Sequence, residues 1–141
     1  GAETDYALFA FQVPLAAAGG ANRNLVIRGV RIEAYNMGAA SATTPTLLQW
    51  ALGVGSTAVS LATADSVTAG TRAPRRIPLG IQSIPIGTPI GGNVTPIDVN
   101  LDAPLYVAAG TFVHIILRMP VGTATASQII RGLAMINGYF E

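Results

Sequence analysis

Apolar and polar residues alternate in short runs along the chain, and segments rich in Gly, Pro, Ser and Thr separate these runs. The runs carry many β-branched and aromatic residues, which favours strands over helices. In one of them Arg31 and Glu33 share the polar face and are expected to pair, and Gly29 predicts a bulge. Strands are expected at Tyr6–Val13, Leu25–Tyr35, Thr46–Val54, Ile77–Ile84, Ile97–Leu101, both halves of Leu101–Pro120, and Ser127–Phe140.

The stretch Leu101–Pro120 carries the strongest pattern and predicts a strand, a tight turn and a second strand. Gly110 supplies the turn because glycine accepts a positive φ. The strand after the turn is apolar on both faces, which His114 and Arg118 alone interrupt, so we expect it to be covered on both sides.

Two other segments raise the question of what covers them. Proline cannot donate to a sheet ladder, so Ile77–Ile84 predicts an edge strand and the Pro/Gly-rich residues 85–96 predict an extended loop. This loop carries Ile86 and Ile90, which either fold back on the domain or reach a neighbouring subunit. The last strand also lacks a polar face, so it is expected at the centre of a sheet or at a subunit seam.

About eight strands without a convincing long helix predict an all-β protein, an antiparallel sandwich or barrel, with a jelly-roll-like β-sandwich preferred. The segment Ser56–Ala69 is ambiguous between a helical turn and an irregular strand. At 141 residues, the chain is expected to form one domain, residues 1–141.

Composition adds an expectation of assembly. Half of the residues are apolar and only 11% are charged, which is low for a free monomer whose surface must be solvated. All eight basic residues are arginine, which suits packed interfaces, although composition bias explains this equally well. The net charge of +1 argues against a nucleic-acid surface. No apolar run is long enough for a membrane span, and no signal peptide is expected.

The sequence does not point to an enzyme, a metal centre or a cofactor. It has no cysteine and one histidine, so a zinc site is not expected, and His114 is interpreted as a core or interface residue. Asp98 and Asp102 lie roughly 13 Å apart along an extended strand, too far for a glycosidase pair. Calcium binding by Asp98, Asn100 and Asp102 is a weaker alternative.

The best candidates for a functional contact are three arginines, Arg72, Arg75 and Arg76, held by Pro74. They form either a solvated loop or a set of salt bridges to an acidic patch on a partner subunit, with phosphate binding as a third interpretation. Trp50 is the only tryptophan and is interpreted as a core anchor; a platform on which sugars stack is the alternative.

Three phrases carry a family resemblance. Residues 56–65 read Ser-Thr-Ala-Val-Ser-Leu-Ala-Thr-Ala-Asp, residues 71–80 read Thr-Arg-Ala-Pro-Arg-Arg-Ile-Pro-Leu-Gly, and Val-Gly-Thr-Ala-Thr-Ala-Ser precedes a closing Asn-Gly-Tyr-Phe-Glu. With these the chain resembles a group of small virion proteins of tailed bacteriophages. The resemblance implies a β-rich head decoration or cement protein that forms oligomers on the capsid surface, and it carries no catalytic residue across.

These observations lead to one expected function and two alternatives. The expected function is a non-enzymatic phage virion protein that stabilises the head, as a homo-oligomer, with a trimer favoured, in contact with the major capsid protein. Its partner-binding residues would be Arg72, Arg75, Arg76, Ile86 and Ile90. The alternatives are a tail-tip or fibre module that binds host-surface glycans through Trp50, Tyr35, Tyr106 and Tyr139, and a jelly-roll coat subunit.

Overall fold

The computed structural model of the chain describes residues 4–38, 44–56, 65–66, 75–120 and 129–141. In this part of the chain there are eight strands and no helix, as the alternation predicted. The strands are β1 (Thr4–Gln12), β2 (Leu25–Asn36), β3 (Thr46–Gly55), β4 (Asp65–Ser66), β5 (Arg75–Ile84), β6 (Ile97–Val107), β7 (Phe112–Arg118) and β8 (Ile130–Phe140). Apart from β4, the ambiguous segment Ser56–Ala69 lies almost wholly outside the described residues.

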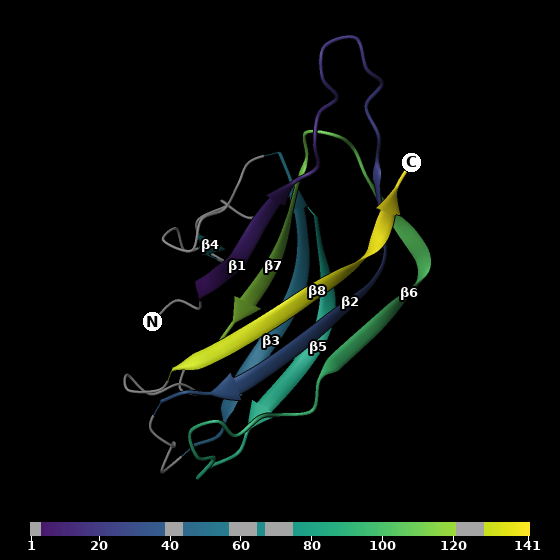
Figure 1. Ribbon diagram of the computed structural model, residues 1–141. Coiled ribbons are helices and arrows are strands. Elements are labelled where there is room, and N and C mark those ends of the chain that lie inside the picture. Colours follow the sequence, from purple (N-terminus) through teal and green to yellow (C-terminus); the bar gives the residue numbers. More distant parts are fainter. Residues whose placement is uncertain (1–3, 39–43, 57–64, 67–74, 121–128) are drawn as a thin grey trace.

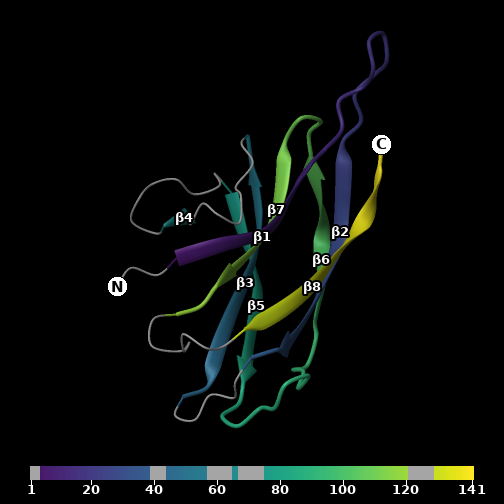
Figure 2. The ribbon, with the colours of Figure 1, turned by 60° about the vertical axis from the view of Figure 1, so that its left-hand side comes forward.

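The strands form two antiparallel sheets that lie face to face (Figures 1 and 2). One sheet has the order β4-β1-β7-β3-β5 and the other the order β6-β2-β8. Strands β3 and β5 are separated in the chain only by the two-residue β4, whereas every other pair joins strands that are distant in sequence. The all-β class and the two antiparallel sheets are therefore confirmed.

The core lies between the sheets and takes the inward face of each strand. Ile32 of β2, Leu52 of β3 and Ile115 of β7 are fully buried there, and Trp50 is 2% exposed. Full burial of a large aliphatic side chain contributes about 1.5–3 kcal/mol, so this layer is the main source of stability. Strand β7 lies between β1 and β3 and is buried on both faces, as its apolar pattern predicted.

The predicted hairpin at Leu101–Pro120 is wrong in its pairing. Gly110 makes the turn with a φ of 83°, but β6 and β7 belong to different sheets and do not pair. The chain thus crosses from one sheet to the other at this turn. The segment Ile97–Leu101 and the first half of the expected hairpin form one strand, β6, interrupted opposite β2 by extra residues at 101–104.

The expectation of a central last strand is also wrong, because β8 pairs with β2 alone among the described residues and lies at an edge (Figure 1). Its inward residues are half-buried, whereas its outward apolar residues face solvent. Apolar residues on both faces of a strand indicate that burial of both faces is favourable. They do not show that a neighbouring strand or subunit covers each face.

Two smaller predictions are confirmed. The register of β2 shifts between Ile27 and Gly29 against both of its neighbours, which leaves Arg28 as the extra residue of a bulge. Strand β5 is an edge strand that ends at Ile84, and residues 85–96 form the expected loop.

Candidate functional site

The loop of residues 85–96 is fixed on the end of β2 by backbone hydrogen bonds. The amide of Asn36 donates to the carbonyl of Gly92 over 2.8 Å, and the amide of Gly91 donates to the carbonyl of Asn36. The amide of Val94 donates to the carbonyl of Ala34 over 3.2 Å. On the side of β2 that β6 occupies, the loop therefore continues the ladder beyond Ile32, the last residue that pairs with β6.

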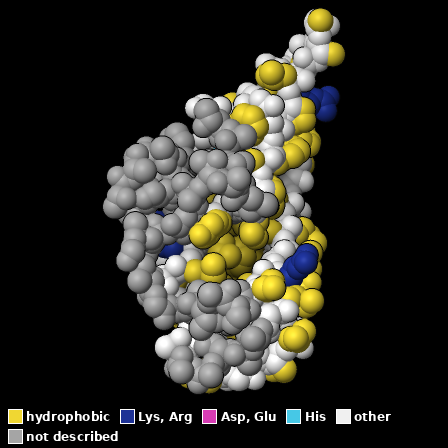
Figure 3. Space-filling view, turned by 90° about the vertical axis from the view of Figure 1, so that its left-hand side faces the viewer, with side chains coloured by type: hydrophobic (Ala, Val, Ile, Leu, Met, Phe, Trp, Pro, Cys, Tyr) yellow, Lys and Arg dark blue, Asp and Glu magenta, His cyan; other side chains and the backbone are white. Residues whose placement is uncertain are grey.

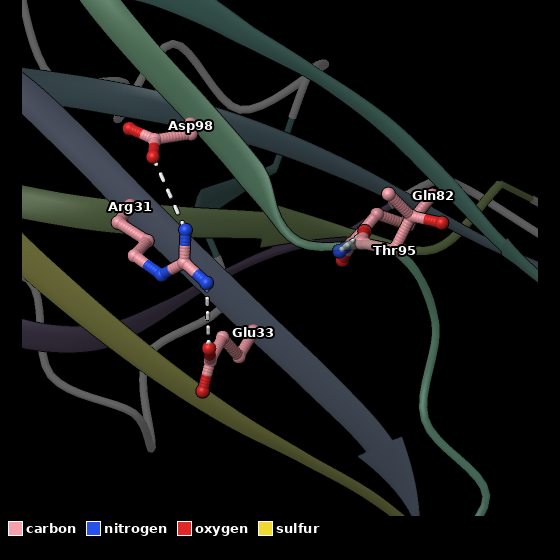
Figure 4. A network of polar contacts seen from close by, with 5 residues as sticks. All are labelled: Arg31, Glu33, Gln82, Thr95 and Asp98. Atoms are coloured by element: carbon pink, nitrogen blue, oxygen red, sulfur yellow. Dashed lines mark hydrogen bonds and ion pairs between the residues drawn. The ribbon is translucent and has the colours of Figure 1, made fainter.

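Buried amide side chains hold the same loop from inside. Asn36 is fully buried, and its Nδ2 donates to the carbonyl of Thr88 over 2.9 Å. Gln82 accepts a hydrogen bond from Trp50 Nε1 at 2.9 Å and donates from Nε2 to the carbonyl of Thr95 at 2.8 Å. Figure 4 shows Gln82 directed toward Thr95. The core tryptophan and the loop are thus joined through one side chain.

The isoleucines of this anchored loop point outward. Ile86 is 52% exposed and Ile90 is 67% exposed, although the backbone around them is hydrogen-bonded to β2. The backbone folds back on the domain, as one of the two expectations held, while both side chains remain available to a partner. On the side of the molecule seen in Figure 3, hydrophobic side chains also reach the surface and gather in a hollow.

The structure describes one side chain of the predicted arginine cluster. Arg72 and the side chain of Arg75 lie outside the described part, whereas Arg76 is half-buried. Arg76 lines a cavity of about 540 Å³ with Arg118 and Ile116, on the face of β7, β3 and β5 that is turned away from the core. Arg76 therefore lies beside a hollow of mixed character and not on an open loop.

The cluster and the isoleucines lie at opposite ends of β5. Arg75 and Arg76 begin the strand, and Ile86 follows its last residue by two positions. At about 3.3 Å per residue, Arg76 and Ile86 are separated by roughly 30 Å. Among the predicted partner-binding residues that the structure describes, Arg75 and Arg76 thus lie in one region and Ile86 and Ile90 in another.

The outer face of the sheet β6-β2-β8 carries a small ionic network (Figure 4). Arg31 donates to Glu33 and to Asp98, each over 3.1 Å, which confirms the expected pair with Glu33. The hydrogen bond to Glu33 is the main cause that raises the pKa of Arg31, so this residue stays charged at any physiological pH. These side chains are well exposed, so the network orients surface charge and adds little stability.

Apolar and aromatic residues flank this network on the same face. Leu133 and Met135 of β8 are 60% and 62% exposed, and they pair in register with Glu33 and Arg31. Further along, Tyr106 and Tyr139 lie on either side of Val26. Alternation along β8 identified its apolar residues, but it did not decide between a covered central strand and a subunit seam.

Trp50 and His114 are buried, which confirms their interpretation as packing residues. Trp50 is enclosed in the core with its Nε1 bonded to Gln82, so it offers no surface for a sugar. His114 is fully buried, with Nδ1 3.4 Å from the carbonyl oxygen of Gly53. Neither residue can act as a solvent-accessible group in this fold.

Acidic residues do not gather into a metal centre within the described ranges. No group of three or more His, Cys, Asp or Glu residues is placed to hold a metal ion there, and Asp98 is engaged by Arg31. The described segments also contain no helix with the length and apolar character needed to cross a membrane.

Comparison with known proteins gives no relative, so an inference about function rests on the fold and the surfaces of the chain. No protein-family model, no curated protein and no solved structure matches the chain.

Proposed function

We propose that the chain is a non-enzymatic virion structural protein, a capsid decoration or cement protein of the tailed-phage type. It would lie on the capsid surface, form a homo-oligomer, with a trimer favoured, and stabilise the head through contacts with the major capsid protein. The resemblance in its sequence supports the virion setting. The surface of the described part supports a role in assembly.

The observation that carries the proposal is the rigid presentation of Ile86 and Ile90. Full burial of an isoleucine side chain contributes about 1.5–3 kcal/mol, and a partner that covers Ile86 and Ile90, which are 52% and 67% exposed, gains roughly half to two-thirds of this from each. Because the loop is already hydrogen-bonded to β2, little ordering entropy is lost on binding. Exposed apolar groups on a preformed loop are therefore suited to lasting contact with another subunit.

The separation of the two predicted contact regions also supports a bridging role. Arg75 and Arg76 lie at the start of β5 and the isoleucines just beyond its end, roughly 30 Å away. In the proposal, Arg72, Arg75 and Arg76 pair with carboxylates of one capsid subunit, while Ile86 and Ile90 pack on another. A single small domain would then connect two neighbours.

We assign the sandwich to the jelly-roll class as part of the same proposal. Support comes from the wide separation in sequence of the paired strands, such as β1 with β7 and β2 with β8. Jelly rolls also interleave distant strands in two sheets and are common in viral capsids.

The test is sedimentation of the purified chain with heads of a tailed phage that encodes it. We expect the wild-type chain to co-sediment at physiological salt, and the variants Ile86→Ser/Ile90→Ser and Arg72→Ala/Arg75→Ala/Arg76→Ala to bind more weakly. Leu15→Ser is the matched control, because Leu15 is 62% exposed and lies in the loop that follows β1, outside both regions. Failure of the wild-type chain to bind heads would overturn the virion role.

One observation favours glycan binding as a second candidate. Tyr106 and Tyr139 are both exposed and flank Val26, and the guanidinium of Arg28 lies 5.9 Å from the centre of the Tyr139 ring. Exposed rings beside a cation can stack on sugars. A glycan array with the wild-type chain and the Tyr106→Ala variant tests this second candidate. Specific binding by the wild-type chain that the variant loses would support glycan binding, and no binding to any glycan on the array would rule it out.

A further inference from the structure

Strand β8 offers an open edge that lacks the usual protection against pairing. It has 11 residues, contains no proline, carries one charged residue, Arg131, and pairs with β2 alone among the described strands. The bulge in this pairing lies on β2, at Arg28, so β8 itself runs without an extra residue. Backbone N–H and C=O groups along such an edge are a template for another strand.

The edge of β6, at the other side of the same sheet, is protected. Pro104 has no backbone N–H to donate to a neighbouring strand, and residues 101–104 break the register of β6 against β2. Asp98 and Asp102 add exposed carboxylates. Proline, irregular backbone and charge are the devices by which natural sheets block edge-to-edge pairing.

The edges of the second sheet are protected in other ways. Strand β5 contains Pro78, and Gly80 with a φ of 138° accompanies a register shift against β3. Strand β4 has only two residues and pairs with Thr4 and Asp5 alone, so the rest of β1 is an edge among the described residues. That edge is irregular, because the register of β1 against β7 shifts between Ala7 and Phe9. Among the described edges, β8 alone is therefore long, regular and free of proline.

We propose that β8 pairs antiparallel with β8 of a second copy of this chain, which joins the two three-stranded sheets into one sheet of six strands. The occupant is a second β8 because the other described edges of a neighbouring copy are unsuited to pairing. A two-fold axis brings the same edge of both copies together, so one surface satisfies both partners.

The exposed side chains select the register of this pairing. With the two-fold axis at Ala134, each exposed apolar residue on the outer face meets another, and Arg131 meets a neutral partner. The pairs across the axis are Ile129 with Tyr139, Arg131 with Asn137, and Leu133 with Met135. On the inner face, Gly132 would lie opposite Ile136, a small residue against a large one. A shift of the axis to Leu133 or Met135 places Arg131 or Asn137 against an apolar side chain.

This interface goes beyond the virion role and does not depend on it. It accounts for Ile129, Leu133 and Met135, which are all more than half exposed and which the loop contacts of the proposed function leave uncovered. If the proposed trimer also forms, the two-fold contact connects trimers, and the number of chains in the particle is even.

Disulfide cross-linking tests the register directly because the chain has no native cysteine. In the variant Leu133→Cys/Met135→Cys, facing residues would have Cα atoms about 4.5–5.5 Å apart, within the range that a disulfide spans. Mild oxidation should yield a covalent dimer on a denaturing gel, and reductant should reverse it. The control is Ile81→Cys/Ser83→Cys, the same spacing on the exposed side of β5. Equal cross-linking in both variants would overturn the register.

Light scattering across a dilution series tests the interface without cross-links. The wild-type chain should show twice the mass of one chain, or a larger even multiple, and Leu133→Lys should halve the number of chains. Ile81→Lys, at an equally exposed position, should leave the mass unchanged. Circular dichroism and Trp50 fluorescence confirm that each variant is folded. A wild-type monomer at every soluble concentration, or a Leu133→Lys variant with unchanged mass, would overturn the proposal. Neither result bears on binding to heads, which is measured separately.

Discussion

At the scale of single residues, two buried amides determine how the loop 85–96 is held. Gln82 connects the core tryptophan to Thr95, and Asn36 connects the end of β2 to Thr88. Each amide satisfies polar groups that would otherwise be buried without a partner, which is costly. The exposed isoleucines therefore rest on polar contacts inside the domain.

Replacing Gln82 by Ala should lower the free energy of unfolding by about 1–3 kcal/mol, because Trp50 Nε1–H loses its acceptor while it remains buried. Urea unfolding followed by Trp50 fluorescence measures this loss. Gln12→Ala is the control, since Gln12 bonds to the carbonyl of Gly110 at an exposed site and should change stability by less than about 0.5 kcal/mol. An equal loss of unfolding free energy in Gln82→Ala and Gln12→Ala would show that the buried hydrogen bond to Trp50 stabilises the fold no more than an exposed one.

Replacing Asn36 by Ala should loosen the loop more than the rest of the domain. The variant loses the bonds to the carbonyl of Thr88 and from the amide of Gly38. We expect faster hydrogen exchange at the amides of Gly91 and Val94, measured by NMR. In the control Asn22→Ala, which removes a bond in the distant loop 14–24, these amides should keep their protection. Unchanged protection in Asn36→Ala would contradict the anchoring role.

At the scale of elements, strand positions could be predicted from the sequence and pairing could not. Period-two alternation and Gly/Pro boundaries placed the long strands, because burial of one face constrains every second side chain. The turn at Gly110 was found as well. A glycine with positive φ fits both a hairpin and a connection that crosses between sheets. The turn at Gly110 therefore does not determine which sheet β7 joins, because that depends on pairing with strands that are distant in sequence. For the same reason, apolar residues on both faces of β8 did not distinguish a central strand from an open edge.

Strand β8 depends on the absence of a side chain at Gly138. A Cβ atom there would collide with the carbonyl of Val26 on β2, and backbone cannot move aside cheaply. Gly138→Ala should therefore reduce stability by about 1–3 kcal/mol, as overpacking does, in a thermal or urea melt. The neighbouring exposed residue offers a control, Asn137→Ala, with an expected change below about 0.5 kcal/mol. A harmless Gly138→Ala would mean that the two strands are farther apart than described.

At the scale of the whole molecule, the sequence identified candidate residues but not their distribution. Arg76 and Ile86 are close in sequence, yet the regular extension of β5 carries them to opposite ends of a sheet. The pattern of β8 left a central strand and a subunit seam as alternatives, because exposure of a face depends on sheet order, which single-strand patterns do not contain. A candidate surface thus became visible only when the strands were assembled.

The same sheet order predicts slow folding. Pairs such as β1 with β7 and β2 with β8 require closure of long loops before any contact is gained. We expect refolding on a timescale of about milliseconds to seconds, as in other β-sandwiches, followed by stopped-flow fluorescence of Trp50. Completion within microseconds would show that local contacts dominate instead.

The order of the strands has a consequence during translation. Strand β2 lies between β6 and β8, so its sheet stays incomplete until the ribosome has synthesised β8. At about 5–20 residues per second, the wait between the end of β2 and the start of β8 is roughly 5–20 s. During this time nascent chains on one polysome carry a β2 that lacks its partner β8. Because β8 is the last of the described strands to be synthesised and completes this sheet, the emergence of β8, rather than the exit of an early subdomain, sets the moment at which each sandwich becomes native.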